Sequence, residues 1–91
     1  MCTYATVKTE LHGSAKGPGG TGSKWFHITD GTVYFDHPVH AMAEHTLNID
    51  FADPSKGPAA RVAVELTAQS ARELVEAIQA ALASAPDALK V

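Results

Sequence analysis

The apolar residues of this chain repeat with two different periods, and the change between them is the strongest constraint on its fold. Up to residue 66, apolar and polar residues alternate in short runs, as in strands with one buried face. From residue 70 onward the apolar residues recur every three or four positions, which is typical of an amphipathic helix. No helical repeat separates the alternating runs, which argues against parallel crossovers. The pattern therefore predicts an α+β fold, an antiparallel sheet followed by one helix.

Five alternating runs are expected to form a curved antiparallel sheet. Asp30-Gly31 is a favoured two-residue hairpin turn, so the runs on either side of it are predicted to be separate strands. Residues 13–23 contain five glycines and a proline and are predicted to be a flexible loop. The predicted strands are residues 3–11, 24–29, 32–37, 45–51 and 60–66.

The helix is expected to begin at a capping box in which Ser70 is the N-cap and Glu73 reaches back to it. Pro86 should end it, since proline cannot continue a helix. The apolar stripe of this helix must then cover the apolar face of the sheet. Residues 1–91 are thus predicted to be one domain, small enough that a homodimer is expected to add stability and protect the sheet edges.

The composition excludes several classes of function. The net charge is −3 and the seven Lys and Arg residues are scattered, so nucleic acid is not an expected partner. No apolar stretch approaches the ~20 residues that span a membrane, and the N-terminus lacks the features of a secretory signal. A single cysteine cannot form an intramolecular disulfide and fits a reducing compartment. A cytoplasmic location is therefore expected.

The segment at residues 36–45 carries the main chemical feature, because it holds three of the five histidines. Strand alternation places His37 and His45 on the inward face at the rim of the core, with His40 in the connection between them. Three converging imidazoles are a recognisable site for Zn, Cu, Fe or Ni. Three nitrogen ligands also leave an open position of the kind that a catalytic metal needs. Residues 36–45 therefore predict a mononuclear metal site.

Two carboxylates flank these histidines. Asp36 and Glu44 are expected to support the site, most simply by orienting the imidazoles. The spacing H-x2-H-x4-H is not a strict signature of any metal class, however. Histidines beside a proline are also found at the surface or bonded to the backbone. A metal-free acid–base role and a purely structural role both stay open.

Other residues suggest different chemistry. Trp25, His27 and Tyr34 are predicted to share the second face of the hairpin, where they would line a small-molecule pocket or form a dimer interface. Cys2 is a candidate soft metal ligand, or a nucleophile if the initiator methionine were removed.

The opening MCTYAT, the segment VYFDHPVHAMAEHTLNIDF and the strand ARVAVELT together resemble a family of small actinobacterial proteins, a domain of unknown function. Some members of that family are encoded near natural-product gene clusters. The resemblance covers nearly the whole chain, and its most specific part is DHPVH…EH. It implies an intracellular protein that acts in or beside specialised metabolism, but no reaction, cofactor or functional residue.

Two classes of function follow from these observations. The first is a small metal-binding protein with a histidine site, either a metal-dependent enzyme or an accessory protein of specialised metabolism. The alternative is a metal-free homodimer that binds or sequesters a small molecule, or a purely structural or interaction domain. The sequence does not decide whether the protein is an enzyme.

Overall fold

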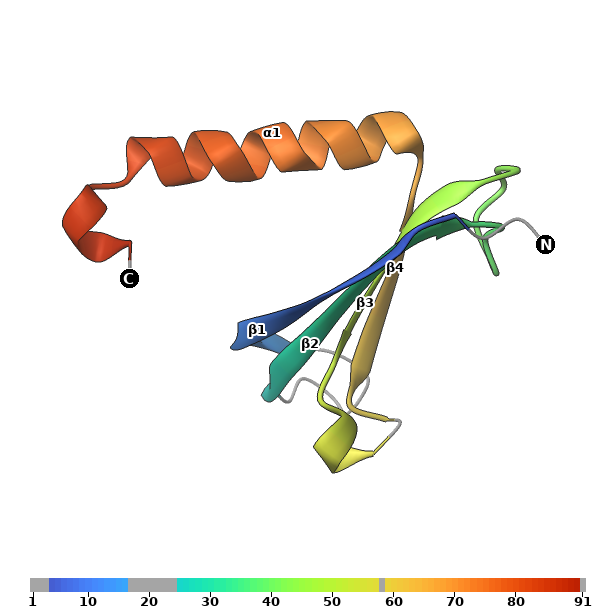
Figure 1. Ribbon diagram of the computed structural model, residues 1–91, viewed down its shortest axis with the longest axis horizontal. Helices are drawn as coiled ribbons and strands as arrows, with labels where there is room; N and C mark the ends of the chain where they lie inside the picture. Colours follow the sequence, from blue (N-terminus) through green and yellow to red (C-terminus); the bar gives the residue numbers. More distant parts are fainter. Residues whose placement is uncertain (1–3, 17–24, 58, 91) are drawn as a thin grey trace.

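The computed structural model describes residues 4–16, 25–57 and 59–90. An antiparallel sheet in the order β1-β2-β3-β4 is followed by one α-helix (Figure 1). The elements are β1 (Thr6–Lys16), β2 (Trp25–Asp36), β3 (Thr46–Ala52), β4 (Arg61–Leu66) and α1 (Ala68–Ser84), with short 3-10 helices η1 (Pro54–Lys56) and η2 (Asp87–Leu89). The α+β class is confirmed. The predicted strand count was five, whereas the structure has a sheet of four.

The difference arises at Asp30-Gly31, where the predicted hairpin turn is wrong. Both residues lie inside the single strand β2 and are paired on both sides, Asp30 with Glu10 and Ala52. A tight hairpin turn of this type needs positive φ angles. Among the described residues only Gly57 has a positive φ, of 92°. The ladder partners on either side of β2 therefore override the local turn preference.

Gly31 has a packing reason to be glycine instead. A Cβ atom at this position would lie 2.9 Å from Cδ1 of Leu11 and 3.3 Å from Cγ2 of Thr9. The β1 side chains cross β2 closely at this point, so a methyl group here requires the Leu11 side chain to shift.

We expect Gly31→Ala to destabilise the protein by about 1–2 kcal/mol, since the new methyl group overpacks against Leu11. The measurement is urea unfolding of the wild type, both single variants and the double variant Leu11→Ala/Gly31→Ala. The clash predicts that Gly31→Ala costs much less in the Leu11→Ala background. Strictly additive effects would contradict the packing role of Gly31.

The first strand is also longer than predicted. β1 continues to Lys16, so residues 13–16 are strand and their assignment to a flexible loop was wrong. The pairing of β1 with β2 shifts register between Glu10 and Gly13, which lets the strand continue past an irregularity. The rest of the predicted loop, residues 17–23, lies outside the described residues.

The helix begins three residues earlier than expected. Thr67, not Ser70, is the N-cap of α1, and its hydroxyl oxygen accepts a hydrogen bond from the Ser70 backbone N–H at 3.1 Å. Thr67 has extended backbone angles and a hydroxyl, which is what an N-cap requires. The C-terminal expectation is confirmed, because the helix ends at Ser84, two residues before Pro86. Within the described residues no helix has the length and apolar character to cross a membrane.

The ladder divides the sheet into two chemically different faces, because directly paired residues point the same way. Val33, Ile49 and Val64 form one cross-strand row on the apolar face. Tyr34, Asn48 and Glu65 form the neighbouring row on the polar face.

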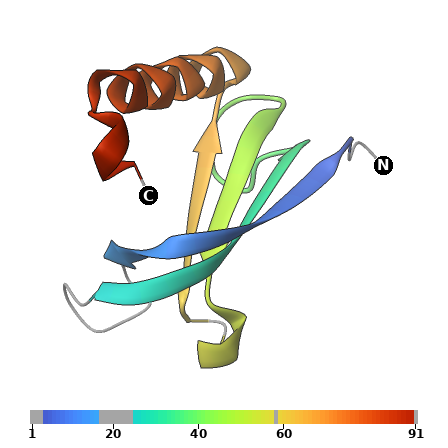
Figure 2. The same cartoon turned by 60° about the vertical axis from the view of Figure 1, so that its left-hand side comes forward.

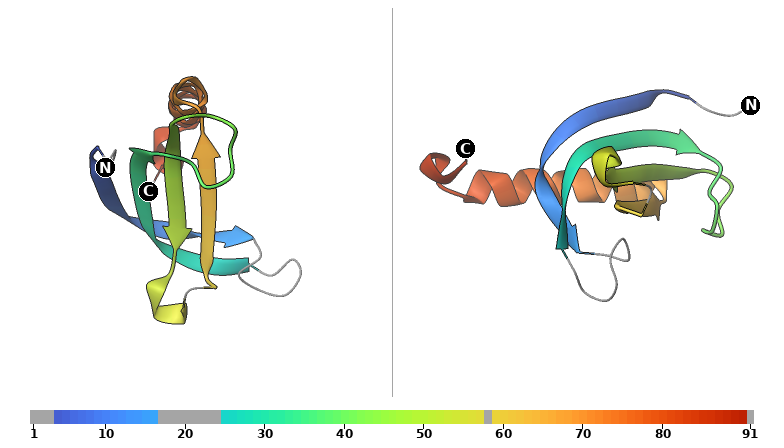
Figure 3. Two further views of the ribbon diagram at one scale, coloured as in Figure 1. Left: turned by 90° about the vertical axis from the view of Figure 1, so that its right-hand side faces the viewer. Right: turned by 90° about the horizontal axis from the view of Figure 1, so that it is seen from below.

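Helix α1 covers only part of the apolar face. Figures 1 and 2 show it leaving the end of β4 and running across one end of the sheet, with its C-terminal half standing away from the strands. The views in Figure 3 show the same arrangement from the side and from below. The predicted covering of the apolar face by the helix stripe is therefore incomplete.

Candidate functional site

The candidate site is built by the register of β2 and β3. Asp36 pairs with Thr46 at the end of the ladder, so residues 37–45 form a connection whose two ends lie side by side. His37 and His45 are the next residues beyond that last pair. The backbone therefore places these two histidines next to each other, although seven residues separate them in the chain.

The two imidazole rings are in contact. Their centroids are 4.5 Å apart and their planes are tilted by 31°. The His45 ring also stacks on Phe35, with centroids 5.7 Å apart and an angle of 11°, and Tyr4 lies 6.4 Å away. An aromatic wall thus supports one side of the histidine pair, at the rim of the apolar face.

Hydrogen bonding distinguishes the ring nitrogens. Nδ1 of His37 lies 3.0 Å from the backbone carbonyl oxygen of Glu44. A carbonyl can only accept, so Nδ1 is the donor, and Nε2 of a neutral His37 ring keeps a free lone pair. Nε2 of His45 is buried and has no hydrogen-bond partner. The pair therefore contains a His37 ring of defined tautomer, whose Nε2 has a free lone pair, and a His45 ring whose Nε2 is buried and unsatisfied.

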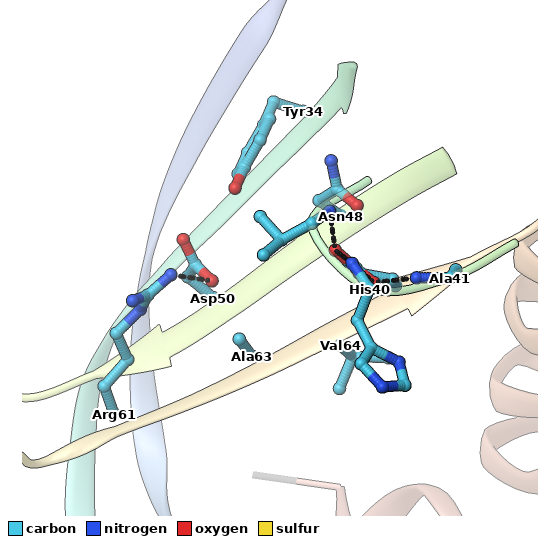
Figure 4. Close-up of a pocket in the computed structure, with 10 residues that line it drawn as sticks. Tyr34, His40, Ala41, Asn48, Asp50, Arg61, Ala63 and Val64 are labelled. Atoms are coloured by element: carbon cyan, nitrogen blue, oxygen red, sulfur yellow. Dashed lines mark hydrogen bonds and ion pairs between the residues drawn. The ribbon is translucent and has the colours of Figure 1, made fainter. Parts of the chain in front are cut away.

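The structure does not bring the third histidine into this pair. His40 is exposed and lines a basin on the opposite, polar face of the sheet, together with Tyr34 and Asp50. Its ring turns away from these two residues (Figure 4). Within residues 4–16, 25–57 and 59–90, no cluster of three or more His, Cys, Asp or Glu side chains could hold a metal ion. The expected convergence of His37, His40 and His45 is therefore reduced to a pair.

The two predicted supporting carboxylates act differently from expectation. Asp36 Oδ1 accepts a hydrogen bond from the His37 backbone N–H at 2.7 Å, which fixes the start of the connection. Glu44 contributes its backbone carbonyl to the His37 ring, while the residue itself is exposed. The orienting role expected of a side chain is thus performed by the main chain.

A residue that the sequence reading did not single out, Glu65 on β4, holds the connection in place. Its carboxylate accepts backbone N–H bonds from Val39 at 2.5 Å, His40 at 3.1 Å and Ala41 at 2.9 Å. These bonds lower the pKa of Glu65, those from Val39 and Ala41 being the largest causes. One carboxylate thereby satisfies three consecutive amides and fixes residues 39–41 over the polar face.

We expect Glu65→Gln to lower the melting temperature most at neutral pH. Since the pKa of Glu65 is lowered in the folded state, its stabilising effect is complete above the usual Glu pKa of about 4.3 and is lost as the pH falls through the lowered value. The difference between wild type and variant should therefore shrink in acid. Glu44→Gln, at an exposed carboxylate, is the control and should show a small difference at every pH. Parallel pH curves for wild type and Glu65→Gln would contradict this role.

The polar face beneath this connection forms a basin of about 540 Å³. Figure 4 shows Tyr34, Asn48 and Asp50 along the face, with the Arg61 side chain reaching Asp50. The Arg61–Asp50 ion pair measures 2.9 Å, and the guanidinium is about half-exposed, so the pair adds little stability. The basin is open and polar, with hydrogen-bonding groups on several sides.

Two of the three buried polar residues in the described part of the chain lie at this same place. Thr46 is completely buried and Asn48 is 5% exposed, and the Thr46 hydroxyl donates to the Asn48 side-chain oxygen at 2.7 Å. Buried polar groups need such partners to avoid a desolvation penalty. A satisfied polar pair therefore forms part of the floor on which residues 39–41 rest.

The phenol of Tyr34 senses this environment. Burial is the largest cause that raises the pKa of this phenol. The negative charge of Asp50 raises the pKa further, and the positive charge of Arg61 lowers it in part. Both raising effects disfavour the phenolate, because it would be poorly solvated and repelled by a neighbouring carboxylate.

We expect the Tyr34 phenol to ionise above the usual pKa of about 10. The measurement is absorbance near 295 nm as a function of pH, in a Tyr4→Phe background that leaves Tyr34 as the one tyrosine. Asp50→Asn should move the midpoint down, and Lys16→Gln at the other end of β1, where Lys16 pairs with Trp25, should not. An unchanged midpoint in Asp50→Asn would exclude the coupling.

The predicted small-molecule group is not assembled. Tyr34 lines the basin, but Trp25 and His27 pair with Lys16 and Ser14 at the other end of β2. His27 and Tyr34 are seven positions apart along the strand, which is about 23 Å. The error follows from the absent hairpin, since folding β2 back on itself would have brought these residues together. Cys2 lies outside the described residues.

Asn48, Arg61 and Glu65 were missed as site residues. Their polar side chains alternate with apolar neighbours along β3 and β4, which the sequence shows, but that pattern also describes any solvent-facing strand surface. Only the cross-strand register and the fold of the 37–45 connection identify them as neighbours.

Comparison with protein-family models matches residues 1–91 to a family of unknown function (DUF6295), so the chain belongs to this family. This confirms the resemblance to an uncharacterised family and bears on neither the source organism nor the neighbouring genes. No curated protein matches the chain. No solved structure matches it either.

Proposed function

We propose that this member of the DUF6295 family is a metal-binding protein that holds a divalent transition-metal ion between His37 and His45. The observation that carries the proposal is the buried, unpartnered Nε2 of His45 beside a second imidazole. Leaving such an atom unsatisfied costs about 1–3 kcal/mol, so a group that satisfies it is favoured.

The bonding of His37 supports a ligand role. Metal-binding histidines commonly donate one ring N–H to a carbonyl or carboxylate, which fixes the tautomer and directs the other nitrogen to the ion. The Nδ1 bond of His37 to the Glu44 carbonyl has this form. The first coordinating nitrogen would therefore be Nε2 of His37.

The spacing of the rings is compatible with one shared ion. Imidazole nitrogens lie about 2.0–2.1 Å from zinc, so two of them in a tetrahedral site are roughly 3.3 Å apart. Rings with centroids at 4.5 Å and a tilt of 31° can present nitrogens at that separation after small rotations. Imidazole suits Zn, Cu, Fe and Ni, the metals expected from the sequence.

The remaining coordination positions would be filled by water, by a substrate or by a residue outside the described ranges. Cys2 is the candidate of that last kind by residue type, since its thiolate is a soft ligand. Open positions on such an ion would permit chemistry on a small molecule. No reaction is assigned to the site.

The alternative function, small-molecule binding without a metal, would use the basin on the opposite face. Its volume of about 540 Å³ lies in the usual range for ligand sites of about 300–1,000 Å³. This basin is lined by more polar groups than is usual for such sites. Its charged residues Arg61 and Asp50 already neutralise each other in an ion pair. The histidine pair is therefore the stronger candidate.

The experiment is titration calorimetry of untagged protein with Zn²⁺, repeated with Cu²⁺ and Ni²⁺. We expect one ion per chain, and His37→Ala and His45→Ala should each weaken binding by ~100-fold, because each removes a direct ligand. At one hundred times the Kd the ion should stabilise the fold by about 2.7 kcal/mol.

Two control variants separate the pair from the wider cluster. His40→Ala and His12→Ala should keep wild-type affinity, since neither ring belongs to the pair. Loss of binding in His40→Ala would restore a site of three histidines. Failure of the wild type to bind any of the three ions would reject the metal-binding function. Cys2→Ser reports whether the thiolate completes the coordination.

A further inference from the structure

The apolar side of this molecule is largely uncovered. Among the described residues, Ala60 is the one apolar residue that is buried. Leu82 and Ile78 on α1 are 54% and 51% exposed, and Val7 on the sheet is 58% exposed. Sequence patterning and structure thus agree on where the apolar surfaces lie, but the single chain does not bury them.

The exposed area exceeds what a compact chain of this size shows. A monomeric protein of 9.5 kDa exposes about 5,000 Å², whereas this chain exposes 6858 Å². The radius of gyration is 14.7 Å, against about 12 Å for a compact domain of this length. The excess of roughly 1,800 Å² falls within the roughly 1,000–2,500 Å² that each partner buries in an obligate dimer.

The uncovered surface consists of two complementary parts. A stripe on α1 contains Leu74, Val75, Ile78 and Leu82. Leu74, Val75 and Ile78 of this stripe and the sheet line a hollow of about 290 Å³ whose walls are apolar apart from Arg72. The stripe continues to Leu82, which is exposed and does not line this hollow. The C-terminal half of α1 stands away from the strands (Figure 1). One chain therefore presents both an unpaired helix face and an unfilled apolar sheet face.

We propose that a second copy of this chain closes the apolar face, in a two-fold dimer in which α1 of each copy packs on the sheet of the other. A two-fold axis pairs the same patch on both copies, so a chain that carries both complementary parts satisfies both at once. The hollow at the centre of this surface is lined by apolar side chains and one charged residue, Arg72, as in the largely apolar cores of permanent interfaces.

The charges of α1 favour a protein partner over a membrane. Helices that lie on membranes carry Lys and Arg along their polar face. The charged residues of α1 are Arg72, Glu73 and Glu76, and the whole chain has a net charge of −3. An anionic lipid surface would repel this helix.

The first experiment is sedimentation equilibrium of the full chain, which should give twice the 9.5 kDa mass of one copy at micromolar concentration. Leu82→Glu should weaken association by ~100-fold, because it places a charge at a buried apolar contact. Ala80→Glu puts the same charge on the opposite side of α1 and should leave the dimer intact. A monomeric wild type, or a dimer equally stable in both variants, would overturn the proposal.

A second measurement does not depend on any variant. In a mixture of isotope-labelled and unlabelled wild-type chains, filtered nuclear Overhauser spectra should show contacts between Leu82 of one copy and Val7 or Val33 of the other. Inter-copy contacts confined to the edges of β1 or β4 would place the interface elsewhere and reject this packing. The test uses no histidine of the metal site, so its outcome is independent of the proposed function.

Discussion

The pairing of Asp36 with Thr46 is the contact on which the rest of the functional architecture depends. Once β2 and β3 are joined in this register, the nine residues between them must leave and re-enter the sheet at adjacent points. His37 and His45 are then neighbours by construction, with ring centroids 4.5 Å apart. A slip of one residue would send the β3 side chains to the opposite face and separate the two rings. Backbone hydrogen bonds in the ladder, not contacts between the imidazoles, therefore set the geometry of the candidate metal site.

The same register gives the two faces of the sheet different side chains and different neighbours. On one face the aliphatic rows of β2, β3 and β4 meet the start of α1, and the histidine pair lies at the rim of this surface beside Phe35. On the other face a polar row supports the connection, and Glu65 satisfies three successive backbone amides. The connection thus places His37 and His45 on one side and His40 on the other. This explains how three histidines within nine residues lie on two different faces of the sheet.

Much of the secondary structure followed from hydrophobic period alone. The strands at residues 45–51 and 60–66 and the end of the helix before Pro86 agree with the structure to within a residue or two. The shared face of His37 and His45 was also anticipated, since alternation along a strand keeps its parity even when a neighbouring turn is misassigned. The Asp30-Gly31 turn failed because local preference was weighed without the partners that β1 and β3 supply on both sides of β2. Gly31 allows the close approach of Leu11 there, a contact that the linear sequence does not show.

The sequence by itself determined the α+β class, the order of strands before helix and the choice of chemical groups near residues 36–45. These depend on periodicity and residue type, which are local properties. Only the tertiary structure decided that β2 is one strand, that Glu65 fixes residues 39–41, and that His40 stands apart from the other two histidines. Each of these rests on contacts between residues twenty or more positions apart. Strand register and the path of a connection set such contacts, and neither can be read from the spacing of residues along the chain.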